Sequence, residues 1–249
     1  MGLIALAIAA PLLRGDPTRA DLVWGGVSGS AGGLGIALLY RALATGRMSV
    51  VAPVTAVCAI IIPVAVGALL GERLSPMVLA GVALAMGAIV LIGQEEDRRA
   101  EHGAAAQGGA RRAAIDRSLA YALAAGVAIG AFYVCLGRTG ADAGLWPLLA
   151  ARVVSVSGFV AVAVVGRRSL RLGAGSRGIV LVAGLLDVTA NALYLLAVRQ
   201  GMMSVVATLS SLYPASTVLL AHLVLGERLR RVQAVGLGAA AVAVVMIAA

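Results

Sequence analysis

The pentapeptide LGERL occurs twice in this chain, at Leu70–Leu74 and again at Leu225–Leu229. Each copy lies between two long apolar runs, so a charged pair interrupts a hydrophobic sequence in the same way at both places. The two glutamates, Glu72 and Glu227, are 155 residues apart. This repetition indicates how the whole chain is organised.

The composition is that of a membrane protein. Hydrophobic residues make up 61% of the 249 residues and charged residues 12%, whereas soluble domains average about 45–50% apolar and about 25% charged. Because a soluble fold needs a polar exterior, most of the surface of this chain is expected to face lipid.

Nucleic-acid binding, cofactors and metals are not indicated. The net charge of +9 comes from arginines in short connectors, and aromatic residues, which stack on bases, make up only 4% of the chain. Cys58 and Cys135 both lie in apolar runs, where cysteine usually acts as a small hydrophobic residue. The sequence therefore predicts no metal site, no cofactor and no disulfide framework.

Eight apolar stretches are long enough to cross about 30 Å of hydrocarbon as helices. They are Leu22–Leu43, Met48–Leu70, Pro76–Ile92, Ser118–Leu136, Leu145–Val165, Ile179–Val198, Met203–Leu225 and Val232–Ala248. Short connectors join most of them, so sequential helices are expected to run antiparallel. The sequence predicts an all-α integral membrane protein, a polytopic helical bundle in the cell membrane.

One connector differs from the others. Residues 94–117 are polar, rich in alanine and glycine, and mixed in charge. This composition is typical of a solvated linker. The predicted organisation is a first repeat over 1–93, the linker, and a second repeat over 118–249.

The two halves align over more than the LGERL motif. At the offset of 155 residues, GRMSVVA at Gly46–Ala52 lies on GMMSVVA at Gly201–Ala207, and Gly81 lies on Gly236. Self-similarity at a fixed offset indicates two copies of one structural unit.

The second copy contains five spans, and an odd number of crossings places two copies in opposite orientations, as in many secondary transporters. The offset aligns Met1 with Val156, so Ser118–Ser155 have no partner in the first copy. The first repeat is therefore predicted to lack its first helix and part of its second. The apolar residues 1–13, too short to span, are interpreted as the remaining part, which gives eight full spans and a partial one.

At these motifs the sequence resembles the EamA-type family of the drug/metabolite transporter superfamily. The resemblance rests on the two LGERL motifs, each with a glycine nine residues beyond the glutamate, and on Pro214, 13 residues before Glu227. In the first copy Ala59 stands in place of that proline. The resemblance implies ten helices in two inverted five-helix repeats, and export or import of small metabolites.

Charged residues inside the spans are candidates for function, because a charge at a helix centre costs roughly 2.5–3.5 kcal/mol on insertion scales. Asp187 lies near the middle of its span and Arg152 about a third of the way into the preceding one. We expect them to pair, either as part of a solute or proton pathway or as a structural pair. Asn191, Tyr194 and Tyr213 add polar groups that could meet a solute.

Prolines and the repeated corner complete the candidate residues. Pro53, Pro63 and Pro214 are expected to interrupt helix hydrogen bonding, and such breaks often line the cavity of a transporter. At the corners, Glu72 with Arg73 and Glu227 with Arg228 are expected to fix the turn, each acid favouring the start of the helix that follows it.

The leading prediction is a secondary transporter that moves a small solute by alternating access, in a lipid bilayer and with proton coupling as one alternative. An integral-membrane enzyme is the second class, but the chain shows no cluster of acids and histidines and no nucleotide-binding glycine loop. A non-transporting subunit or truncated remnant is the third.

The orientation has two alternatives. Counted with Arg41, the connectors after the first, third, fifth and seventh spans hold 14 arginines, and the other side, counted with Arg14 and Arg19, holds 5. The positive-inside rule places the first set in the cytoplasm. The family pattern with both termini inside places the linker outside.

Overall fold

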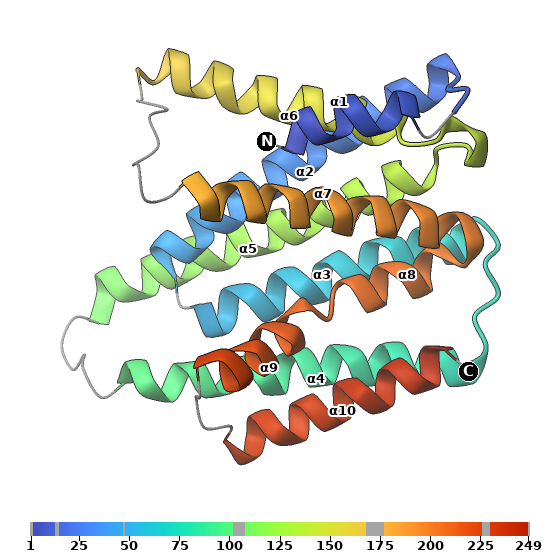
Figure 1. The fold of residues 1–249 in the computed structure, drawn as a ribbon. Coiled ribbons are helices and arrows are strands. Elements are labelled where there is room, and N and C mark those ends of the chain that lie inside the picture. The colour runs from blue at the N-terminus through green and yellow to red at the C-terminus, as the bar shows by residue number, and fades with distance from the viewer. Residues whose placement is uncertain are drawn as a thin grey trace. The chain divides into compact units, whose positions relative to one another are not determined.

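The computed structural model describes residues 2–12, 15–46, 48–101, 108–167, 177–225 and 230–248. These residues are almost entirely helical and contain no strand. The elements in chain order are α1 (Gly2–Leu12), α2 (Arg19–Thr45), α3 (Met48–Leu69), α4 (Pro76–Glu101), α5 (Gly108–Gly137), the short 3-10 helix η1 (Ala141–Ala143), α6 (Trp146–Val165), α7 (Arg177–Gln200), α8 (Met203–Ser210), α9 (Tyr213–Leu225) and α10 (Arg231–Ala248) (Figure 1).

The eight predicted spans are confirmed. Eight stretches of the described chain are long and apolar enough to cross a membrane, with α8 and α9 together forming one of them. Helix α1 has 11 residues, and a rise of about 1.5 Å per residue makes it about 16 Å long, too short to cross hydrocarbon.

The predicted linker is more helical than its composition indicated. Helix α4 continues to Glu101 and α5 begins at Gly108, so only residues 102–107 of the segment 94–117 lie outside the described part of the chain. Alanine, glutamate and arginine are strong helix formers, and they extend both helices past their apolar segments.

The prolines differ in their effect on the helices. Helix α3 continues through Pro53 and Pro63; proline has no N–H to donate, so each removes one helix hydrogen bond without ending the helix. Transmembrane helices tolerate proline because neighbouring groups satisfy the freed backbone atoms. At Pro214 the interruption does occur: Ser211 and Leu212 form a turn that separates α8 from α9.

The chain divides into two compact units, and each draws on both halves of the sequence. Unit 1 comprises residues 1–34 and 131–201, and unit 2 comprises residues 35–130 and 202–249. The unit boundaries fall within α2 and α5 and between α7 and α8. The compact units are therefore not the two sequence repeats.

Helix boundaries recur at the same interval as the sequence motifs. Helices α3 and α8 begin at Met48 and Met203, and α4 and α10 begin at Pro76 and Arg231. Helices α2 and α7 end at Thr45 and Gln200. Each pair is separated by 155 residues, so the interval that aligns LGERL also aligns these helix ends.

In unit 2, helices α4 and α10 pack together along one matched set of contacts (Figure 1). A Cβ atom added to Gly81 would lie 2.8 Å from Ile247 Cγ1 and 3.3 Å from the carbonyl oxygen of Ala243. A Cβ atom on Gly236 would lie 2.8 Å from Ile92 Cγ1 and 3.3 Å from the Ala88 carbonyl oxygen.

These two sets of contacts are equivalent under the offset of 155 residues. The beginning of α4 meets the end of α10 and the reverse, so these corresponding helices run antiparallel. The contact has the form of a local two-fold relation.

In unit 1, glycine also allows close helix packing, here between α2 and α6. A Cβ atom on Gly25 would lie 2.8 Å from the Cα of Pro147, and one on Gly29 would lie 2.6 Å from the Cα of Ala151. The neighbouring atoms belong to the backbone and cannot move aside. The glycines at these positions therefore serve helix packing, which supplies the stability that apolar burial does not supply in lipid.

We predict that Gly81→Leu and Gly236→Leu destabilise the protein to a similar extent, because each new side chain meets an equivalent isoleucine and carbonyl. Overpacking of this kind costs about 1–3 kcal/mol. Thermal unfolding of the detergent-purified protein measures the effect. Gly87→Leu and Gly238→Leu are matched controls, since a Cβ atom at either position meets nothing within 4 Å. Clearly unequal losses of thermal stability in the Gly81 and Gly236 variants would contradict the two-fold relation.

Candidate functional site

The expected pairing of Arg152 and Asp187 is present in unit 1. Nη2 of Arg152, on α6, donates a hydrogen bond to Oδ2 of Asp187 on α7, and the two groups form an ion pair. Arg152 is the seventh residue of α6, about 9 Å along the helix from its start. Because a guanidinium remains protonated in proteins, it needs a counter-charge at this depth, and Asp187 supplies it.

Asn191 holds the same carboxylate from its own helix. Its Nδ2 donates to Asp187 Oδ1 at 3.2 Å and to the Asp187 backbone carbonyl at 2.7 Å. The two carboxylate oxygens thus have different partners, Arg152 for one and Asn191 for the other. Asp187 and Asn191 are four residues apart and share one face of α7.

Tyr194 continues that face of α7 but is held by other contacts. Its side chain is buried, and its hydroxyl donates to the backbone carbonyl of Tyr133 on α5 at 3.1 Å. The rings of Tyr133 and Tyr194 lie 4.6 Å apart between centroids. Tyr194 therefore joins α7 to α5 within unit 1, and the structure gives it a packing role.

The side chains of the ion pair are partly exposed at the surface of the protein. The exposed fraction of the side chain is 23% for Arg152 and 46% for Asp187. Among the described residues, Asp187 is the one polar partner of the Arg152 guanidinium. The remaining N–H donors of this fork are therefore available to another acceptor.

In the first LGERL motif, the glycine and the glutamate have distinct structural roles. Gly71 has φ of +90°, its N–H bonds to Ala68 O at 3.1 Å, and Glu72 N–H bonds to Gly67 O at 2.9 Å. This is the Schellman pattern, in which a left-handed glycine ends a helix. Gly71 thus terminates α3.

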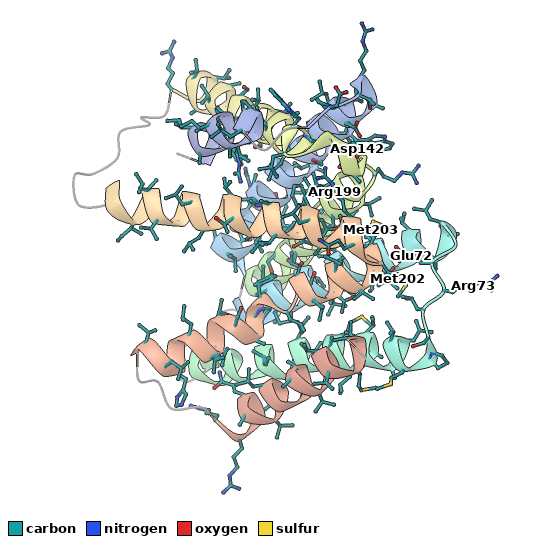
Figure 2. All side chains as sticks on the ribbon, turned by 45° about the vertical axis from the view of Figure 1, so that its right-hand side comes forward. Glu72, Arg73, Asp142, Arg199, Met202 and Met203 are labelled. Atoms are coloured by element: carbon teal, nitrogen blue, oxygen red, sulfur yellow. The ribbon has the colours of Figure 1, made fainter. Side chains whose placement is uncertain are left out.

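Glu72 binds the start of a helix distant in sequence (Figure 2). Its Oε1 accepts from the backbone N–H of Met203 at 2.8 Å, and its Oε2 accepts from the backbone N–H of Ser204 at 3.2 Å and from the Ser204 hydroxyl. The first N–H groups of a helix lack internal partners and carry partial positive charge. A carboxylate from the α3–α4 corner therefore caps α8.

The expectation that this acid serves the following helix is wrong for Glu72. The start of α4 is capped by Ser75, whose Oγ accepts from Val78 N–H at 3.2 Å. Arg73 is exposed and points away from the capped helix (Figure 2). Glu227 and Arg228, the corresponding residues of the second motif, lie outside the described residues.

The remaining candidates belong to unit 2. Tyr213, directly before Pro214, is partly exposed, and its hydroxyl lies 3.5 Å from the Ala52 carbonyl on α3. Pro63 accepts the Ser204 hydroxyl at its carbonyl, also at 3.5 Å. Pro53 lies within the continuous α3. The contacts of Tyr213 and Pro63 join α3 to the interrupted span α8–α9.

Sequence reasoning missed a buried acid in unit 1. Asp21 accepts hydrogen bonds from Thr18 N–H at 2.9 Å, Thr18 Oγ1 at 2.6 Å and Gly140 N–H at 2.7 Å. It ties the start of α2 to the turn after α5. The spacing T-x-x-D, typical of a helix N-terminus, was the available signal for the local part of this network.

Among the described residues, no group of three or more His, Cys, Asp and Glu side chains is placed to hold a metal ion. In the described residues, eight apolar spans of the required length and an almost entirely helical backbone define the class of this chain: it is a polytopic helical membrane protein.

Comparison with known proteins places it more closely. Residues 117–249 match the EamA-like transporter family. The match covers more than half of the chain, so the chain belongs to this family, within the drug/metabolite transporter superfamily. This confirms the resemblance that the LGERL motifs indicated, and a family of transporters implies residence in a lipid bilayer and movement of small solutes. No curated protein matches the sequence.

Among solved structures with a similar fold is the crystal structure of another protein. The TM-score is 0.65 at 19% sequence identity, and the alignment covers 99% of this chain and 84% of the other. At this identity the likeness concerns the fold alone.

We predict that Glu72→Ala destabilises the protein by about 0.5–2 kcal/mol, the range measured for loss of a helix cap. Glu72→Gln, which keeps one acceptor oxygen, is expected to lower the free energy of unfolding by less. Thermal unfolding in detergent measures both changes. Arg73→Ala, an exposed neighbour in the same turn, is the matched control and is expected to change little.

A double-mutant cycle tests whether Glu72 acts through α8. Ser204→Ala removes the hydroxyl that bonds to Glu72, so the losses from Glu72→Ala and Ser204→Ala are expected to be less than additive. Additive losses would mean that the two side chains stabilise the protein independently.

For the ion pair, we predict that Arg152→Gln and Asp187→Asn each lower thermal stability more than the double variant does. A single substitution leaves one charge within the span without its partner, whereas the double substitution removes both charges. Unfolding temperatures of the four proteins provide the comparison. A double variant that is less stable than both single variants would contradict the prediction, because it would show that an unpaired charge is not the main cause of the lost stability.

Proposed function

We propose that this chain is a secondary transporter that moves a small solute across the cytoplasmic membrane by alternating access. The observation that carries the proposal is the packing of α4 against α10, in which equivalent helices of the two sequence repeats meet antiparallel through equivalent residues. Two copies of one unit in opposite orientations can exchange conformations, and this exchange opens a site to alternate sides of the membrane.

On this proposal the repeats comprise residues 1–93 and 118–249, joined by 94–117. The repeats are inverted, as the antiparallel run of α4 and α10 supports. The interruption between α8 and α9 supports the same function, since interrupted membrane helices are common at the solute sites of secondary transporters.

The Arg152–Asp187 pair with Asn191 is the proposed solute and proton site. A charged pair within an apolar span is costly and therefore a functional candidate. Its accessibility supports this role over a purely structural one, because a pair needed only for packing has no need of an exposed carboxylate.

Reconstitution tests the proposal. The purified protein is placed in proteoliposomes with a defined mixture of amino acids, organic acids and amines inside, and counterflow of each labelled solute is measured with and without a pH gradient. We expect at least one class of solute to exchange, and Asp187→Asn to reduce the response to the gradient.

Protein-free liposomes give the background rate of exchange in this assay. A folded protein that exchanges no member of the mixture contradicts the proposed function and favours a subunit that does not transport alone.

A further inference from the structure

We propose that Arg152 is the binding group for the carboxylate of a small organic anion, and that Asp187 takes up a proton when this carboxylate binds. The inference rests on the proposed transport function and names the solute class of the same site. It makes the co-transported species one carboxylate and one proton.

The first argument is the unused capacity of the guanidinium. Arginine presents five N–H donors in a planar fork that matches a carboxylate with two parallel hydrogen bonds. In the described structure only Nη2 of Arg152 is engaged, by a single oxygen of Asp187. The pairing is therefore not the two-bond arrangement that this group can form. A second carboxylate can take the better geometry.

The second argument is that Asp187 is held independently of Arg152. Asn191 donates to Oδ1 at 3.2 Å and, from the same nitrogen, to the Asp187 carbonyl at 2.7 Å. When a solute carboxylate occupies Arg152, the side chain of Asp187 remains fixed on the face of α7. The guanidinium of Arg152 thus passes from the carboxylate of Asp187 to that of the solute, while Asp187 keeps its position.

The third argument is charge balance. Arg152 and Asp187 together are neutral, and addition of a carboxylate leaves one uncompensated negative charge inside an apolar span, which is costly. A proton taken from water onto Asp187 restores neutrality. A like charge beside a carboxylate favours its protonated form. Binding of the anion therefore draws in the proton.

Among the described residues of unit 1, no hydrogen bond or ion pair joins another charged side chain to the pair. The described helix α1, which packs against α6 and α7, carries no titratable side chain between Gly2 and Leu12, and α6 carries none besides Arg152. The other titratable groups on the described helices of unit 1 are Arg19 and Asp21 on α2, Tyr133 and Cys135 on α5, Asp142 on η1, and Arg177, Tyr194 and Arg199 on α7. None of these makes a described contact with Asp187.

The experiment uses benzoate as the probe, because it joins a carboxylate to an apolar body suited to apolar helices. Binding to the protein in lipid nanodiscs is measured by calorimetry, and proton uptake by pH change in weakly buffered solution. We expect benzoate to bind with uptake of a single proton, and the isosteric neutral benzamide not to bind. Arg152→Gln is expected to weaken benzoate binding roughly tenfold or more, since the charge-assisted bonds are lost.

Two further variants separate binding from folding. Arg152→Lys keeps the charge but loses the fork, so it is expected to bind benzoate more weakly while remaining folded. Asp187→Asn is expected to bind benzoate without proton uptake. Arg167→Gln, which removes an exposed arginine at the end of the same helix, is the matched control and is expected to bind as the unaltered protein does.

Several results would overturn the inference: no benzoate binding by the unaltered protein, equal binding of benzamide, unchanged binding in folded Arg152→Gln, or proton uptake that persists in Asp187→Asn. Counterflow on the same preparations separates this failure from failure of the proposed function. If solute exchange persists in Arg152→Gln, the proposed transport function stands and the carboxylate site at Arg152 is contradicted. If benzoate binds with proton uptake but no solute is exchanged, the carboxylate site stands and the proposed transport function is contradicted.

Discussion

The carboxylate of Glu72 at the start of α8 joins the two halves of the sequence. It brings the LGERL corner of the first half to the MSVVA segment that begins a helix in the second half. In lipid the free N–H groups of a helix start have no water to bond, so a carboxylate at that point satisfies donors that would otherwise be costly. Gly67 leaves room for this contact, because a Cβ atom there would clash with both the Glu72 carboxylate and the Ser204 hydroxyl. In the described residues, the first LGERL motif thus binds the second MSVVA segment.

A second constraint follows from the cost of charge in an apolar environment. Arg152 and Asp187 satisfy each other across two helices, but with a single oxygen and a single nitrogen. Asn191 completes the carboxylate without replacing the arginine. The result is a pair in which one hydrogen bond joins the arginine to the carboxylate, and the proposed exchange of partners depends on this single bond. The buried Asp21 shows the contrast: three hydrogen bonds from fixed groups hold it, and it is almost inaccessible.

Length and hydropathy predicted the eight spans because a helix must cross a fixed thickness of hydrocarbon, and the unfavourable insertion of lone charges predicted the Arg152–Asp187 pair. The partner of Glu72 was not predictable in the same way, since Met203 and Ser204 are contacted through tertiary packing across more than 130 residues. Proline was an unreliable guide: α3 passes through Pro53 and Pro63, while α8 ends near Pro214. Whether a proline breaks a helix depends on what surrounds it, and sequence alone does not carry that information.

The contact between α4 and α10 uses the same residue types on both sides: glycine at 81 and 236, isoleucine at 92 and 247, and alanine at 88 and 243. Such a surface is complementary to itself. A single short polypeptide carrying it could associate with an identical copy lying in the membrane the other way up. The contact between α4 and α10 therefore has, within one molecule, the form of an interface between two identical chains.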